Sequence, residues 1–390
     1  MIYLDNSSTT KIDPEVLEAM LPYLQDEYGN PSSSHYTLAK NAKRAVEEAR
    51  EKLASLINAK SEEIIFTAGA SESNNFVIKG VSDYKKMYEK SGNHIITSKV
   101  EHKSVLQVCR FLNGEIYMNN EKKRLGKIIT PQVDRGYEVD FLDVNEYGQV
   151  TLDTLESTIK DNTSLISLIW GNNEIGSLND IATLSKLAKQ RNITFHSDAT
   201  QVLGKLTIDV DKISADYLSF SAHKLYGPKG VGAVYMRKPK RTPVDITSLI
   251  HGGYQENFYR AGTHAVHNIV GFGKAAEIAK RDLAKNIEKL EKLELQAKEM
   301  IKAKYPNVEF LGDPNNHIPG LIGMIIPGIV NEMFIKERCE DLAISAGSAC
   351  GIGEPSYVIN EIGYGNVSSS FVRLSLCKHN NMNDIHILLK

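Results

Sequence analysis

The chain has 390 residues, of which 42% are hydrophobic and 24% charged, and its formal net charge is −2. This length is sufficient to bury a large core, and we expect two domains. The balanced charge gives no reason to expect a nucleic acid or a membrane as partner. The four cysteines form no Cys-x-x-Cys pair, and the sequence shows neither a secretory signal nor an apolar run of membrane-spanning length. We therefore expect a cytoplasmic protein without a disulfide framework or a metal site.

The first part of the chain alternates strand and helix patterns. A short strand at residues 2–4 precedes a helix from Pro14 to about residue 25, with Asp13 as the N-cap and proline at the first helical position. A long helix is predicted over about 36–57, because its apolar residues recur at helical spacing. Residues 63–67 form the next predicted strand.

Small residues follow the strand at 63–67. Ala70 and Ser71 begin a predicted helix, and small side chains there leave backbone N–H groups open to an anion. The alternative is that Ser71 is an ordinary N-cap, which is the commoner role. His102 stands near the start of the helix that we expect from residue 101, where a lone histidine is more often a cap or a surface residue.

Apolar runs that end in polar residues mark the centre of the chain. Residues 165–170 form a buried strand that ends beside Asn173, and residues 194–198 form another that ends at Asp198. A helix predicted at 151–159 precedes the first of these strands, and one predicted at 180–191 precedes the second. The alternation predicts an α/β fold in which ligands bind at the carboxyl ends of parallel strands.

The stretch 216–234 carries the strongest chemical signal. Its apolar run from Tyr217 to Phe220 delivers Ser221, His223 and Lys224 to a strand end, where a tight glycine turn follows. A desolvated lysine has a lowered pKa, so its neutral amine can form a Schiff base with a carbonyl. A solvated loop lysine is the alternative. The turn lacks the pattern of a phosphate-binding P-loop, whereas Asp198 at the neighbouring strand end suits a pyridoxal ring nitrogen.

Three segments resemble the cysteine desulfurases, which are pyridoxal-phosphate enzymes of the class V aminotransferase group. They are Asp198-Ala-Thr-Gln201, Ser219-Phe-Ser-Ala-His-Lys224 and Ser348-Ala-Cys350, and the resemblance extends over nearly the whole chain. It implies the fold-type I architecture of pyridoxal-phosphate transferases, with a large domain around a mostly parallel seven-stranded sheet and a smaller α+β domain. We assign residues 15–255 to the large cofactor-binding domain, and residues 1–14 with 256–390 to the small one.

The resemblance also implies roles for individual residues. Ala70 and Ser71 would hold the cofactor phosphate, and Thr263 would reach the phosphate of a neighbouring subunit in a homodimer. His102 would stack on the pyridoxal ring and serve as a proton donor or acceptor for the substrate thiol. The remaining assignments are Asn173 and Gln201 for the 3-oxygen, Asp198 for the ring nitrogen, Ser221 and His223 as further cofactor contacts, Lys224 for the Schiff base, and Arg373, with Asn173, for the substrate.

Cys350 lies between small residues and glycines, where a nucleophilic thiol has access, although a free cysteine is more often a buried small hydrophobe. The family cysteine that it matches takes sulfur from L-cysteine as a persulfide, leaving L-alanine. The sulfur then passes to an acceptor protein, such as an iron–sulfur scaffold or a thiolation enzyme. A selenocysteine lyase or a small-amino-acid aminotransferase of the same group is the alternative.

A further alternative is a catalytically silent protein of this fold that binds partners through residues 113–140. This stretch is longer than the usual connection in the family, and an exposed hairpin is its simplest interpretation. The intact set of Lys224, Asp198 and Arg373 favours an enzyme.

Overall fold

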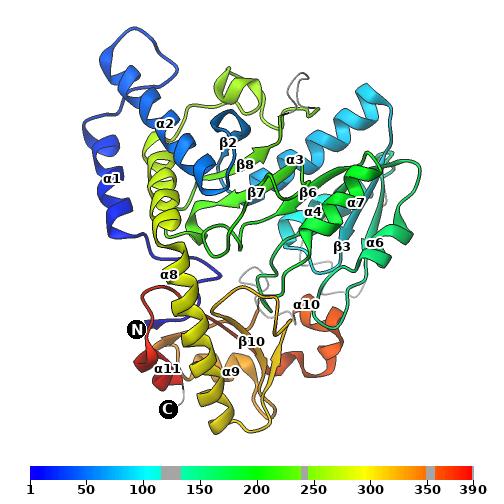
Figure 1. Cartoon of the computed structure of the whole chain (residues 1–390), viewed down its shortest axis with the longest axis vertical. Helices are drawn as coiled ribbons and strands as arrows, with labels where there is room; N and C mark the ends of the chain where they lie inside the picture. Colours follow the sequence, from blue (N-terminus) through cyan, green and yellow to red (C-terminus); the bar gives the residue numbers. More distant parts are fainter. Residues whose placement is uncertain (116–132, 239–244, 348–355, 389–390) are drawn as a thin grey trace.

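The computed structural model describes residues 1–115, 133–238, 245–347 and 356–388. A seven-stranded sheet lies at its centre (Figure 1). In sheet order the strands are β2 (Ile64–Thr67), β8 (Gly232–Met236), β7 (Tyr217–Ser221), β6 (Thr194–Asp198), β5 (Thr163–Ile169), β3 (His94–Ser98) and β4 (Glu138–Leu142). All neighbouring pairs are parallel except those of β8, which runs antiparallel to both β2 and β7. The predicted α/β fold with a mostly parallel seven-stranded sheet is confirmed.

Both faces of this sheet are covered by helices, which explains its almost continuous apolar strands. Ile64 and Phe66 of β2 pack into one hydrophobic cluster, and Ile65 between them packs into another on the opposite face. The first cluster includes residues of α1 (Pro14–Gln25), α2 (Thr37–Leu56), α6 (Leu152–Thr158), α7 (Ile181–Gln190) and the first half of α8 (Val266–Lys304). The second includes residues of α3 (Ala70–Tyr84) and α4 (Lys103–Leu112). Successive side chains of a strand point to opposite faces of the sheet, so the same strands contribute to the hydrophobic clusters on both faces.

A smaller layer of structure surrounds the second half of α8. Leu290, Leu293, Ala297 and Ile301 of this helix pack against an antiparallel sheet in the order β12-β10-β9. Its strands are β12 (Phe371–Ser375), β10 (Leu321–Ile325) and β9 (Glu309–Leu311), and the remaining elements are β1 (Ile2–Tyr3) paired with β11 (Leu342–Ala343), α9 (Asn331–Lys336), α10 (Tyr357–Ile359) and α11 (Met382–Leu388). Figure 1 shows α8 running between the two parts, with both chain ends beside the smaller one.

Most predicted elements occur where the sequence placed them. Asp13 is the N-cap of α1, its side chain accepts a hydrogen bond from the N–H of Glu15, and Pro14 occupies the first helical position. The helix predicted from residue 101 begins instead at Lys103, because His102 is its N-cap. Residues 116–132 of the proposed insertion lie outside the described residues, and the boundary between the two domains stays a prediction. In the described ranges, no helix is both long and apolar enough to cross a membrane.

Candidate active site

A cavity of about 600 Å³ opens at the carboxyl ends of the central strands. Most residues that the sequence singled out line it together: Ala70, Ser71, His102, Asn173, Asp198, Gln201, Ser221, His223, Lys224 and Arg373. They come from elements that are far apart in sequence, and the parallel strands bring them to one edge of the sheet. Convergence of this kind on one concave site is the expected arrangement for a bound small molecule.

Lys224 lies in a short 3-10 turn directly after β7. Its ammonium group donates hydrogen bonds to the backbone carbonyls of Ser7, at 2.5 Å, and Ser8, at 2.6 Å. The polar loop after β1 therefore forms one wall of the cavity and holds the lysine in place. Because these contacts are made by carbonyl groups, the side chains of the loop gave no signal for them.

Asp198 ends β6 and is only 4% exposed. Its Oδ2 accepts a hydrogen bond from Asn74 Nδ2 at 2.8 Å, and its Oδ1 accepts one from the N–H of Thr200 at 3.0 Å. These two hydrogen bonds fix the orientation of the carboxyl group. Two residues earlier, burial lowers the pKa of His196 to about 4, so this histidine is neutral near pH 7.

The first turn of α3 forms another wall. Its N-cap is Gly69, with φ +153°, and no side chain among the described residues caps the helix. The interpretation of Ser71 as the N-cap is therefore wrong. The first-turn N–H groups have no partners within the helix, and Ala70 and Ser71 line the same cavity as Ser221 and His223.

His223 lies on the cavity wall close to two lysines. Burial, together with the charges of Lys224 and Lys229, lowers the pKa of His223 to about 4.

Arg373 is 1% exposed in the middle of β12. Its Nη1 donates to the carbonyl of Asn173 at 2.8 Å, and its Nη2 donates to Asp5 Oδ1 at 2.6 Å and to Ser8 Oγ at 2.9 Å. In the part of the chain that the structure describes, Arg373 Nε and Asn173 Oδ1 are buried without a hydrogen-bond partner. Orphaned groups of this kind require an explanation, and a bound polar ligand supplies one.

His102 and Gln201 complete the inner wall. His102 Nδ1 accepts from the N–H of Ser104 at 3.2 Å, so the capping role and a place on the cavity wall coexist in one residue. Gln201 Nε2 donates to the carbonyl of Ser7 at 2.9 Å, the same carbonyl that holds Lys224. Lys205 Nζ donates to Gln201 Oε1 at 2.9 Å.

Two predicted site residues have not yet been accounted for. Thr263 is exposed and does not line it. Cys350, with Ser348 and Ala349, lies outside the described residues. Sequence reasoning missed the loop of Ser7 and Ser8, and also Asn74. The position of Asn74, one turn into the helix that follows the predicted anion site, was a signal for its inward placement.

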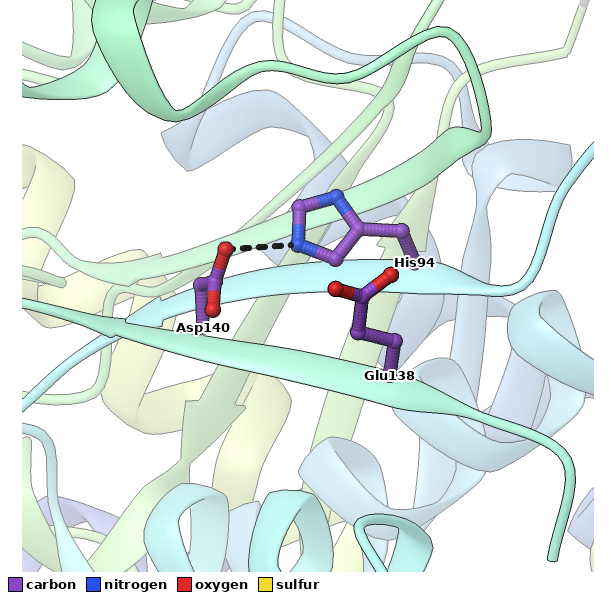
Figure 2. A group of neighbouring side chains, drawn as sticks. All are labelled: His94, Glu138 and Asp140. Atoms are coloured by element: carbon purple, nitrogen blue, oxygen red, sulfur yellow. Dashed lines mark hydrogen bonds and ion pairs between the residues drawn. The ribbon is translucent and has the colours of Figure 1, made fainter.

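A second cluster of charged groups lies at the amino ends of β3 and β4. Figure 2 shows the His94 ring facing Asp140, with Glu138 beside them. The His94 Nε2–Asp140 Oδ2 distance is 3.1 Å, and the three side chains are close enough together to bind a metal ion. However, Lys160 Nζ lies 2.6 Å from Glu138 and 2.8 Å from Asp140 and pairs with both carboxylates. The cluster is therefore an ion-pair network.

Comparisons with known proteins agree with this geometry. The family model described as aminotransferase class V matches residues 2–125 and 129–388. The chain is 42% identical to a protein named cysteine desulfurase IscS from Dictyoglomus turgidum, covering 93% of this chain and 85% of that protein. It is 41% identical to the protein of the same name from Plasmodium falciparum, where 93% of this chain spans 62% of the relative's length. A solved structure named NifS-like protein matches with a TM-score of 0.86 and 31% identity, over 100% of this chain and 97% of the other.

The sheet, the covering helices and the placement of the cavity define a fold-type I pyridoxal-phosphate enzyme. Within this class, the chain belongs to the aminotransferase class V family. The cavity fits pyridoxal phosphate. Within the described part of the chain, its lining includes a lysine, a carboxylate held by two donors, a helix start without a side-chain cap, and two residues with buried unpaired polar atoms, Asn173 and Arg373.

Proposed function

We propose that this chain is a cysteine desulfurase, which converts L-cysteine to L-alanine and transfers the sulfur to Cys350. The convergence of Lys224, Asp198 and Arg373 on one cavity carries this proposal, because these groups suit a carbonyl cofactor, its ring nitrogen and a substrate carboxylate. The names of the relatives from D. turgidum and P. falciparum, both cysteine desulfurases, support the choice of cysteine as substrate.

Residues around the cavity would hold pyridoxal phosphate at defined points. The start of α3, at Ala70 and Ser71, suits the phosphate, with Ser221 and His223 beside it. Asp198 would pair with the ring nitrogen, His102 would stack on the ring, and Asn173 and Gln201 would contact the 3-oxygen. When bound, the cofactor supplies an electron sink for the carbon next to the amino group of the substrate.

The chain's own groups would perform the remaining steps. Arg373 would bind the substrate carboxylate through its planar guanidinium group, since this residue lines the cavity. The Lys224 amine would take the alpha proton. The Lys224 side chain donates its hydrogens to the carbonyls of Ser7 and Ser8, which can only accept. Cofactor or substrate would have to compete with these carbonyls for Lys224. His102 would move the proton of the substrate thiol.

The sulfur-transfer step balances with Cys350 as the acceptor. The carbon–sulfur bond of the substrate breaks and a sulfur–sulfur bond forms on Cys350, while the carbon fragment keeps the electron pair and gains a proton to become alanine. The resulting persulfide would then be passed to an acceptor protein, such as an iron–sulfur scaffold or a thiolation enzyme.

A homodimer is part of the proposal. Thr263 is exposed and lies outside the cavity of its own chain. This placement is what a role at a neighbouring subunit's cofactor phosphate requires.

Alanine release from L-cysteine without added thiol tests the proposal directly. We expect wild-type protein to release alanine and to carry a persulfide at Cys350, and Cys350→Ala to bind the cofactor but lose both products. Alanine release from Cys350→Ala at the wild-type rate would contradict the role of Cys350. Formation of pyridoxamine phosphate from alanine, with no alanine released from cysteine, would identify an aminotransferase instead.

A further inference from the structure

Lys205 lies behind the cavity rather than in its wall. It lies in the loop that follows β6 and is partly buried, and its Nζ donates to Gln201 Oε1 at 2.9 Å. Together with Lys224 and Ser7 it borders a separate cavity of about 20 Å³, which has room for little more than one water molecule. Any effect of Lys205 on the cofactor must therefore pass through its neighbours.

The hydrogen bonds of Gln201 determine which way its amide faces. The ammonium form of Lys205 can only donate and a carbonyl can only accept, so charged Lys205 fixes the position of Oε1 and the Ser7 carbonyl fixes that of Nε2. Rotating the amide by half a turn would set the two oxygens of Gln201 and Ser7 against each other. The Nε2 of Gln201 carries a second hydrogen besides the one donated to Ser7, and Gln201 lines the main cavity.

Placing a lysine here is costly. Burial, and then the positive charges of Lys224 and Arg373, lower the pKa of Lys205 to about 7. A lysine that served only to fill space would be replaced at no loss by an uncharged side chain. The hydrogen bond to Gln201 is the compensating interaction that the structure provides.

We propose that Lys205 is a positioning residue, which fixes the amide of Gln201 so that an N–H faces the cofactor. The proposal rests on the proposed contact between Gln201 and pyridoxal phosphate, but not on the identity of the substrate. Lys205 and Gln201 should then act as one unit, and loss of either should weaken cofactor binding through the same interaction.

A double-mutant cycle tests this coupling. The dissociation constant for pyridoxal phosphate is measured from its visible absorption in wild type, Lys205→Met, Gln201→Leu and the double variant. We expect Lys205→Met to raise the constant about tenfold, since it removes a hydrogen bond from a charged donor. We expect the double variant to bind no more weakly than Gln201→Leu, and Lys205→Arg, which keeps a donor, to bind within about threefold of wild type.

The control is Lys212→Met, which removes an exposed lysine with no contact to the cavity. If the two substitutions raise the dissociation constant for pyridoxal phosphate independently, so that their factors multiply in the double variant, the role of Lys205 is wrong. An unchanged dissociation constant in folded Lys205→Met would also overturn it. If Gln201→Leu alone leaves the constant unchanged, the cofactor contact of Gln201 fails instead. Thermal unfolding of each apo-variant shows that the comparison is made between folded proteins.

Discussion

The strands of the seven-stranded sheet collect charged side chains at both of their ends, which we call the amino edge and the carboxyl edge. The two differ in how completely these side chains are paired. At the amino edge, Asp140 bonds to His94 and Lys160, and Glu138 also bonds to Lys160. At the carboxyl edge, the described structure leaves Arg373 Nε and Asn173 Oδ1 without partners beside a cavity. Of these two clusters, the one that leaves polar groups unsatisfied beside a cavity is the one suited to bind a ligand, although both are rich in charge.

The largest effect is expected from Lys224 at the carboxyl edge. Lys224→Ala removes the group that would hold the cofactor and move the alpha proton, so the turnover number should fall by about 10³-fold or more. Alanine release at saturating cysteine, with cofactor content measured on the same sample, checks this. The exposed Lys212→Ala serves as control. A fall of less than about tenfold would show that this edge is not the catalytic one.

A third polar cluster, away from both edges, shows how much a buried carboxylate with several partners contributes to stability. The side chain of Glu256 is fully buried and accepts hydrogen bonds from Arg50, the N–H of Phe66 and His264. Burial alone would raise the pKa of Glu256, but its bonds to Arg50 and His264 lower it from 4.5 to about 2. The folded state therefore binds this proton less readily than the unfolded state.

Glu256→Gln should lower the free energy of unfolding at pH 7 by about 3 kcal/mol, because it leaves Arg50 without its buried partner. In wild type, this stabilisation is present above pH 4.5 and is lost as the pH falls toward 2, so the variant should be less sensitive to acid over that range. Urea unfolding at several pH values measures both effects.

Glu47→Gln is the matched control for Glu256→Gln. Glu47 pairs with the same arginine, but its side chain is 52% exposed. Its loss should cost less than about 0.5 kcal/mol. Equal losses for the two variants would show that burial of the carboxylate does not decide its contribution.

Arg373 allows a finer test at the carboxyl edge. Arg373→Lys keeps a positive charge near Asp5 but loses the planar fork that can bind both oxygens of a carboxylate. The KM for L-cysteine should rise about tenfold, with a smaller change in the turnover number. Steady-state kinetics measure the two separately. Arg191→Lys, on an exposed arginine paired with Glu156, should change neither value, and an unchanged KM in Arg373→Lys would exclude its contact with the substrate.

Sequence reasoning located most of this edge because apolar runs identify buried strands, and parallel strands end together. Lys224, Asp198 and Asn173 follow three such runs, and the structure brings all three to one cavity. The carbonyls of Ser7 and Ser8 could not be found in this way, since any residue supplies a carbonyl. The residue roles stay predictions, as do the domain boundary and the homodimer.

The same limit applies to pairing. His94 and Glu138 begin strands and Asp140 lies in the middle of one, but only the fold shows that Lys160, from a different segment, pairs with both carboxylates. Whether a polar group is satisfied depends on contacts between distant segments, so the distinction between the two edges is a property of the tertiary structure.

The smallest effect is expected at the amino edge. Asp140→Asn removes one carboxylate, but Lys160 keeps Glu138 as a partner, and the side chain of Asp140 is 39% exposed. The loss in free energy of unfolding should therefore be no more than about 1 kcal/mol. Burial, and next the charge of Lys160, already lower the pKa of His94, so the ring stays neutral at pH 7 when Asp140 is replaced.

Activity and cofactor affinity of Asp140→Asn should equal those of wild type, because the amino edge lies at the other end of the strands from the cavity. Incubation with a metal chelator should likewise leave the unfolding midpoint unchanged, since Lys160 occupies the position that a cation would need. A chelator-dependent midpoint in wild type that is lost in Asp140→Asn would show that the cluster binds a metal. In that case, side chains that are paired with one another at the amino edge would also form a functional site, and pairing alone would not distinguish a structural cluster from a binding site.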